Sequence, residues 1–358
     1  MNSAFAVYSS GIQTKNDKAT VAFAKAEVWK NVQAIADQSI EETKAAFPVG
    51  KKGGWSASAA KADLLASGPS ENRLARILYN PLDWRWTYYT GKTSAFHARP
   101  RRDVLQHVVR SGNLGLMFNR QIVGDRVSHF GVADSLAAHG TFYLGNKGQD
   151  YLAPLWIRGT EGRSLAQPNL SPAFIARLAK LTDLRFDDGS DAPAQGALPG
   201  TELPLPAQGA LALRRERGDL TTTFGARDVF DWIYAVLHSP TYRERYADFL
   251  KSDFARVPCP KDRDLFAALI PLGTRLVALH LLDADALPDL LADPKVRFLS
   301  NGGEARLGRF NKEVRRDASG RVYLNPTNWF ATVPQASWDH WIGGYQSAQK
   351  WLKDRSQT

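Results

Sequence analysis

The stretch LGLMFNRQIVGDRVSHFGV, residues 114–132, decides how we interpret the middle of the chain. Two short apolar runs, LGLMF and RVSHFGV, flank a polar segment that contains Asn, Gln, Gly and Asp. Such runs, bounded by turn-forming residues, are typical of β-strands joined by tight turns. Further strands are predicted for TFYLG at 141–145 and for WRWTYY at 84–89, which alternates as a half-buried strand does.

Helices are predicted on both sides of this strand-rich region, because apolar side chains recur there at three- and four-residue steps. They are expected at 20–46, 59–78, 101–110, 228–237 and 264–282, the last interrupted at Pro271, with a restart at Ser239-Pro240 where Ser is the N-cap. The order of helices, strands and helices indicates an α+β fold rather than repeated βαβ units.

The last segment, 295–358, predicts a hairpin followed by a helix. RFLSNGGEARLG and GRVYLNPTNWF are the expected strands, and Ser337 is the expected N-cap of a final helix that places Trp338, Trp341 and Tyr345 on one side.

Composition suggests where the chain divides. Residues 187–211 are rich in Asp, Gly, Pro and Ala and contain PAQGAL twice, so we expect a linker or long surface loop there. The predicted parts are a helical spacer or connector at 1–78, a strand-rich core at 79–186, this linker, a helical segment at 212–292, and the hairpin with its helix at 293–358.

The chain has 358 residues and a net charge of +10, from 46 Lys and Arg against 36 Asp and Glu. A basic folded chain makes a polyanion such as nucleic acid a candidate partner. No stretch approaches the ~18 consecutive apolar residues of a membrane span, and the first residues lack a secretory signal, so we expect no membrane association and a cytoplasmic location. The single cysteine, Cys259, excludes an intramolecular disulfide framework and a multi-cysteine zinc site.

The motifs of common catalytic sites are missing from the sequence. It has no phosphate-binding G-x-x-x-x-G-K-[ST] loop, no G-x-G-x-x-G, no H-E-x-x-H and no G-x-S-x-G. Tyr79-Asn80-Pro81-Leu82 is similar to the base-holding motif of amino-methyltransferases, but the second proline and the aromatic are replaced. A turn at a strand edge is the better interpretation, and we predict no catalytic residue and no metal ligand.

Residues 97–129 form the densest basic stretch. Arginine grips phosphate bidentately and reads guanine, while side-chain amides suit adenine edges. We therefore predict phosphate contacts from Arg99, Arg101, Arg102 and Arg120, and base contacts from Asn119, Gln121 and Gln149. A second basic stretch at 297–321 could enter a groove, although a solvated basic face explains it equally well.

Several long segments of the chain resemble the C-terminal specificity region of Type ISP restriction–modification enzymes. They are YNPLDWRWTYYTGK (79–92), ARPRRDVLQHV (98–108), GLMFNRQIVGD (115–125), HGTFYLGNKGQDYLAPLW (139–156), DVFDWIYAVLHSPTYRERYADFLKSDFARVPCP (228–260) and WDHWIGGYQSAQKWLKDR (338–355). YSSGIQTKNDKATVAF, at the start, resembles more weakly the segment that joins the methyltransferase core to the recognition domain.

The resemblance implies a sequence-specific reader of double-stranded DNA, with the target recognition core at 79–186. In that family a nuclease, a helicase-like motor, a coupler and an adenine-N6 methyltransferase come before the recognition domain. These parts would precede residue 1, so we expect a separated module that is not an enzyme by itself. S-adenosylmethionine, ATP and Mg would be bound by the absent domains, so no cofactor is expected here. The expected partners are double-stranded DNA and an adenine methyltransferase domain or subunit.

Three alternatives stay open at this point. The chain could be a diverged intact methyltransferase, a protein-interaction module that does not bind DNA, or a binder of single strands or RNA. Binding of S-adenosylmethionine, and affinity for duplex that falls steeply with salt, distinguish among them.

Overall fold

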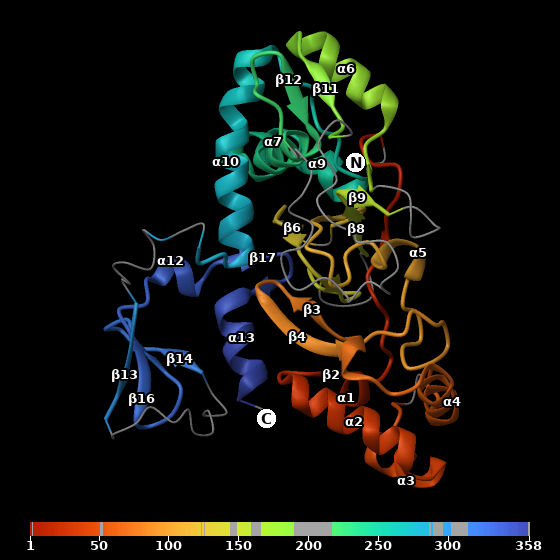
Figure 1. Ribbon diagram of the computed structural model, residues 1–358. Helices are drawn as coiled ribbons and strands as arrows, with labels where there is room; N and C mark the ends of the chain where they lie inside the picture. The colour runs from red at the N-terminus through yellow and green to blue at the C-terminus, as the bar shows by residue number, and fades with distance from the viewer. Residues whose placement is uncertain are drawn as a thin grey trace.

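The computed structural model describes residues 1, 3–50, 53–122, 124, 126–143, 149–158, 166–189, 217–285, 288, 296–301 and 314–356. Two small sheets occupy the middle of the molecule, with helices beyond them at both ends (Figure 1). A third four-stranded sheet, formed by the C-terminal segment, stands to one side (Figure 1). The α+β fold class predicted from the sequence is confirmed.

The first sheet has the order β1-β8-β5-β6 and is antiparallel throughout. Its strands are β1 (Ser9–Ser10), β5 (Gly115–Asn119), β6 (Phe130–Ala133) and β8 (Asp150–Pro154). Every residue of β5 and β6 is buried, which explains why the two runs are apolar without alternation. The strand predicted at 114–118 is confirmed, and the second strand begins only at Phe130.

The strand predicted at 141–145 does not form over its described residues, which make a bend. The reason is a buried carboxylate: the Asp150 side chain accepts hydrogen bonds from the amides of Gly140 (3.1 Å) and Phe142 (2.9 Å). These hydrogen bonds hold the segment against the first residue of β8. Residues 144 and 145 lie outside the described residues.

The second sheet has the order β2-β4-β3-β7, from β2 (Val21–Ala22), β3 (Leu74–Asn80), β4 (Asp83–Tyr88) and β7 (Leu136–Ala137). The prediction of a helix at 59–78 was wrong for its second half, where β3 forms instead. Helix α4 (Ala57–Ser67) ends at Gly68, whose φ of +67° suits glycine, and the 3-10 turn η1 (Glu71–Arg73) leads into β3. Residues 84–88 of the alternating WRWTYY run lie in β4.

Helices α1 (Asp17–Thr20), α2 (Lys25–Asp37) and α3 (Ile40–Ala46) precede α4 at the lower end (Figure 1). The single helix predicted at 20–46 is divided because Ser39 begins a new one. Ser39 Oγ accepts from the Glu42 amide (3.3 Å), and the Glu42 carboxylate accepts from the Ser39 amide (2.8 Å), which is a capping box. Val28, Val32 and Ile35 of α2 are buried.

The other end holds the helices α6 (Pro172–Thr182), α7 (Ala226–His238), α8 (Pro240–Arg245), α9 (Ala247–Ser252) and α10 (Arg263–Leu281). It also holds two two-stranded sheets. One pairs β9 (Trp156–Ile157) and β10 (Gln167–Pro168), and the other pairs β11 (Arg185–Asp187) and β12 (Thr223–Gly225). The N-cap predicted at Ser239 is confirmed, since its Oγ accepts from the Tyr242 amide (3.4 Å). Pro271 does not interrupt α10, which runs through it.

Helices α7 and α10 pack closely side by side (Figure 1). A Cβ on Gly273 of α10 would lie 1.8 Å from the backbone oxygen of Asp231 in α7, so only glycine allows this approach. The Asp231 carboxylate accepts from Thr274 Oγ1 (2.7 Å) and Arg227 Nε (2.9 Å). Among the described helices, α10 is the one that is long and apolar enough to cross a membrane by length and composition; here its inner face packs on α7.

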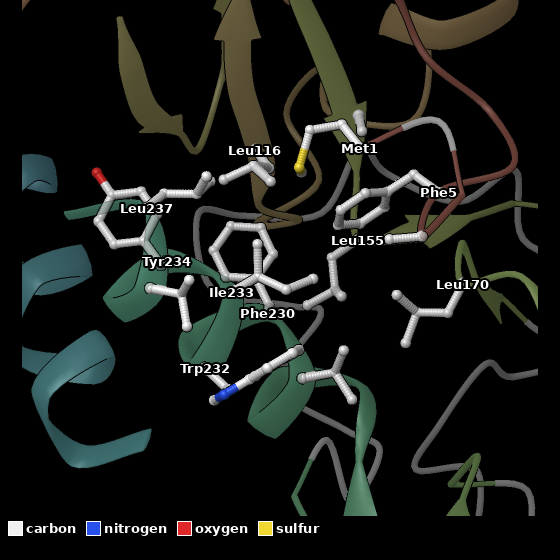
Figure 2. Packing of buried hydrophobic residues seen from close by; sticks show 14 of the residues in the cluster. Met1, Phe5, Leu116, Leu155, Leu170, Phe230, Trp232, Ile233, Tyr234 and Leu237 are labelled. Carbon is white, nitrogen blue, oxygen red and sulfur yellow. The ribbon is translucent and has the colours of Figure 1, made fainter. Parts of the chain in front are cut away.

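The largest core joins α7 to the first sheet and to the start of the chain. Figure 2 shows Phe230 and Ile233 of α7 near Leu116 of β5, with Met1 and Phe5 beside them. The N-terminal segment then continues downward: Ser9–Ser10 pair with β8, and Val21–Ala22 pair with β4. It therefore pairs with both central sheets.

The C-terminal sheet has the order β13-β16-β15-β14, from β13 (Arg297–Ser300), β14 (Arg315–Arg316), β15 (Val322–Tyr323) and β16 (Asn328–Ala331). The final helix predicted from Ser337 was wrong. One helical turn, α12 (Gln335–Trp338), is followed by the hairpin β17 (Trp341–Ile342) and β18 (Tyr345–Gln346), and then α13 (Ser347–Arg355) begins. Gly343 turns the hairpin with a φ of +60°, and its missing side chain lets it approach the Phe142 backbone. Trp338 and Tyr345 thus do not share one helix.

A helix was predicted over 101–110. The structure has the short helix α5 (Arg102–Leu105) there, and residues 106–110 continue as non-helical turns. The predicted linker at 187–211 lies outside the described residues from position 190 onward. The predicted domain boundaries stay predictions.

Candidate nucleic-acid interface

Arg120 and Gln149 lie next to each other where β5 and β8 leave the first sheet. The last paired residues of these strands are Asn119 and Asp150, and Arg120 and Gln149 come one position further out. The Arg120 side chain is exposed, with Nε 3.6 Å from an Asp253 oxygen and the guanidinium 5.8 Å from the centre of the Phe254 ring. An exposed ion pair of this kind contributes little to stability, so the guanidinium is free to change partners.

Arg99 and Arg101 come from the segment that precedes α5. Arg99 is exposed and is held by two backbone hydrogen bonds of 3.0 Å with Gln13, one in each direction. Arg101 is half-buried and has a left-handed backbone, with a φ of +56°, at the start of α5. The N-terminal segment thus fixes the position of this arginine pair.

Electrostatic effects on two neighbouring side chains connect these cations. Burial lowers the pKa of His139, and the charges of Arg101, Lys15 and Arg99 lower it further. Burial raises the pKa of Tyr151, while the charges of Arg120 and Arg101 oppose that rise. The charge of Arg101 therefore acts on both side chains. We call Lys15, Arg99, Arg101 and Arg120 the basic surface.

The remaining predicted residues take different positions. Gln121 is exposed directly after Arg120, and Gln149 is half-buried beside it. Arg102 is exposed on α5, but its aliphatic stem packs on Gly91, where an added Cβ would lie 3.2 Å from Arg102 Cδ. The structure thus places Gln121 and Gln149 beside the basic surface and turns Arg102 toward Gly91.

Asn119 does not lie where the sequence prediction placed it. It is 2% exposed, on a strand whose residues are all buried, and it faces Asp150 across the sheet. Burial raises the pKa of Asp150 to about 7, against the hydrogen bonds from Phe142 and Gly140 that lower it. In this position the Asn119 side chain is covered, so the structure does not place it on the exposed surface with Gln121.

A cavity of about 450 Å³ lies beside the basic surface, and the sequence interpretation did not find it. It is lined by Ile12, Gln13, Thr14, Lys15, Asp17, Tyr79, Asn80, Ala138, His139, Gly140, Tyr143 and Tyr345. The hydroxyls of Tyr79 and Thr14 both donate to the Asp17 carboxylate. The polar run TKND at 14–17 is the sequence signal that could have pointed to it.

The second basic stretch is only partly described, since Arg306, Arg309 and Lys312 lie outside the described residues. Arg316 is occupied within the C-terminal sheet: its Nε donates to the Val333 carbonyl (2.7 Å) and Nη1 to Gln335 (2.6 Å). Arg321 stacks over Trp329 at 6.0 Å. Arg316 and Arg321 thus have partners within the C-terminal sheet and its neighbourhood.

A family model of the Type ISP C-terminal specificity domain matches residues 3–358. The chain belongs to this family. The resemblance predicted from the sequence is therefore confirmed over nearly the whole length of the specificity domain. No curated protein matches it.

Solved structures with the same fold are much longer proteins. The cryoEM structure of a DrdV–DNA complex has a TM-score of 0.62 at 18% identity, over 99% of this chain and 31% of that one. A nuclease-deletion mutant of the Type ISP enzyme LlaGI, in complex with a DNA substrate mimic, has a TM-score of 0.59 at 16% identity, over 98% of this chain and 24% of that one. The ATP-dependent Type ISP enzyme LlaBIII bound to DNA has a TM-score of 0.61 at 15% identity, over 96% of this chain and 20% of that one. At these identities the likeness shows the fold, and this chain spans between a fifth and a third of the length of each of those chains.

Proposed function

We propose that this specificity domain reads double-stranded DNA and selects the site at which an adenine-N6 methyltransferase acts. The observation that carries the proposal is the basic surface, in which Arg99 and Arg120 are exposed and the amides of Gln121 and Gln149 lie at the same end of the first sheet as Arg120. The LlaGI and LlaBIII structures, described as DNA complexes, support the same assignment.

The residues divide by the chemistry of their side chains. Lys15, Arg99, Arg101 and Arg120 contact phosphates and set the position of the duplex, which carries no sequence information by itself. Gln121 and Gln149 then read base edges, for which a side-chain amide is bidentate to adenine. Arg120 directly follows a strand of the first sheet, and the segments of Lys15 and Arg99 are joined through the Gln13–Arg99 bridge, so these cations have fixed backbones before DNA arrives.

We infer that catalysis is supplied by another domain or subunit, an adenine methyltransferase, and that S-adenosylmethionine, ATP and Mg are bound there. The junction of β12 and α7 supports this inference. A loop that binds a cofactor phosphate leaves the first amides of the following helix free for that phosphate. Here the strand enters the helix directly, and the Asp228 carboxylate accepts hydrogen bonds from the amides of Gly225 (2.9 Å) and Gly218 (2.7 Å). The junction does not fit a cofactor phosphate or carboxylate. A cytoplasmic location suits such a partner.

Fluorescence anisotropy with labelled duplex across a salt series tests the proposal. Four phosphate contacts predict a log–log slope of affinity against salt of roughly −3 to −4. Absence of duplex binding would favour a protein-interaction module, and preferential competition by single strands or RNA would favour the third alternative. Calorimetric binding of S-adenosylmethionine by this chain would favour an intact methyltransferase.

A further inference from the structure

The cavity beside the basic surface is built from four separate parts of the chain. The segment 12–17 forms one wall, Tyr79 and Asn80 at the end of β3 form another, and 138–143 and Tyr345 complete it. Its volume of about 450 Å³ is in the range of small-molecule sites. The base-holding motif considered at Tyr79-Asn80 therefore lies at a cavity, although no methyltransferase core is present in this chain's sequence.

The cavity presents ring surfaces together with hydrogen-bonding groups. Tyr143 and His139 are edge-to-face with ring centres 5.7 Å apart, and Tyr143 Oη lies 2.8 Å from His139 Nε2. Tyr79 donates its hydroxyl to Asp17, and burial together with the Asp17 charge raises its pKa, so it stays protonated. The Asp17 carboxylate therefore supplies acceptor oxygens at this wall and already accepts from the Tyr79 and Thr14 hydroxyls.

Positive charge gathers on one side of this cavity. Lys15 lines it directly, and Arg99 is joined by two backbone hydrogen bonds of 3.0 Å to Gln13, another lining residue. Aromatic rings and a carboxylate in the lining, with Lys15 at the cavity and Arg99 next to it in space, match the parts of a nucleotide. The base stacks on a ring, its N–H groups donate to a carboxylate, and its phosphate meets the cations.

The walls are held in place without a ligand. Asn80 Nδ2 donates to Asp354 (3.1 Å), whose carboxylate also binds Arg85 and Lys350. Tyr345 Oη donates to the Tyr143 carbonyl (3.1 Å), and Asp150 holds the amides of Gly140 and Phe142. A cavity fixed from several sides costs little to organise on binding.

We propose that this cavity binds one unpaired nucleotide of DNA, turned out of the helix beside the basic surface. The inference rests on the proposed DNA-binding function and adds a second mode of contact to it. A matched duplex must lose stacking and pairing before a nucleotide enters, which costs a few kcal/mol, whereas an unpaired nucleotide has already lost its partner.

The test compares two duplexes of one sequence, fully matched and with one extra unpaired nucleotide, by anisotropy with the full chain. The unpaired duplex should bind on the order of tenfold more tightly. Tyr143→Ala and Asp17→Asn should remove this preference while binding of the matched duplex persists. Tyr143→Phe, which keeps the ring and the fold, should retain most of it, and Lys44→Ala on α3 is the unaffected control.

A second readout is 2-aminopurine at the unpaired position, whose fluorescence should change on binding the wild type and not on binding Tyr143→Ala. Equal affinity for the two duplexes, or a preference that survives in both cavity variants, would overturn this inference and leave the proposed function standing. Absence of binding to either duplex would overturn the proposed function, and this inference with it.

Discussion

Arg120 is the first residue after β5, and its guanidinium lies near both an Asp253 oxygen and the Phe254 ring. If it grips a phosphate, Arg120→Ala should weaken binding to all duplexes alike and reduce the salt slope by about 1. If it reads guanine, the loss should be about 1–3 kcal/mol at one base position. Anisotropy with a set of single-base variants distinguishes these results, with Lys44→Ala as the matched control. Unchanged affinity and slope would remove Arg120 from the interface.

Asp150 is buried with a pKa raised to about 7, above its ordinary value of 3.8. A raised carboxyl pKa means that the folded state binds more protons than the unfolded state between these values. Its contribution to stability is therefore largest at low pH and falls as pH rises toward 7, by at most about 1.4 kcal/mol per pH unit. Denaturant unfolding from pH 5 to 8 should show that slope in the wild type and less of it in Asp150→Asn. An identical pH dependence in both proteins would contradict the assignment.

At the scale of elements, the contact of α7 with α10 depends on one residue without a side chain. Gly273→Ala places a methyl group within 1.8 Å of the Asp231 oxygen, so the helices must separate. We expect a loss of about 1–3 kcal/mol in the free energy of unfolding, measured in denaturant. Gly50→Ala is the control, because a Cβ there has nothing within 4 Å, and its stability should be nearly unchanged. Equal effects of the two substitutions would show that the helices are not in this register.

The elements that the sequence predicted well are those whose signal is local. The strand at 115–119 and the N-cap at Ser239 follow from apolar runs and capping residues nearby in the chain. The failures come from partners distant in sequence. Asp150 bends the segment at 141–143, and Phe142 receives the Gly343 turn in the middle of the predicted final helix.

The candidate interface shows the same division. The arginines could be predicted because their density is visible in the sequence, and Arg99 and Arg120 are indeed exposed. Asn119 could not be placed, because a strand covered on both faces gives no alternation to separate inward from outward side chains. Lys15 and His139 lie together only through the pairing of distant segments, which leaves no spacing to recognise.

At the scale of the whole molecule, the first residues of the chain join the parts. Phe5 is 1% exposed in the core with α7, whereas Phe249 on α9 is 71% exposed. Phe5→Ala should therefore cost about 3–5 kcal/mol of stability in denaturant unfolding, and Phe249→Ala close to none. Circular dichroism and tryptophan fluorescence should give one shared transition for Phe5→Ala. Two separate transitions would show that the ends of the molecule unfold independently.

The contact of Tyr345 with Gly140 joins positions 205 residues apart, so the cavity wall closes only after Tyr345 has left the ribosome. Long-range contacts of this kind slow folding, because loop closure must come before the contact. During translation, the arginines of the basic surface emerge well before the residue that completes the neighbouring cavity. A nascent chain therefore carries the charge of this surface before it has the complete shape of the cavity.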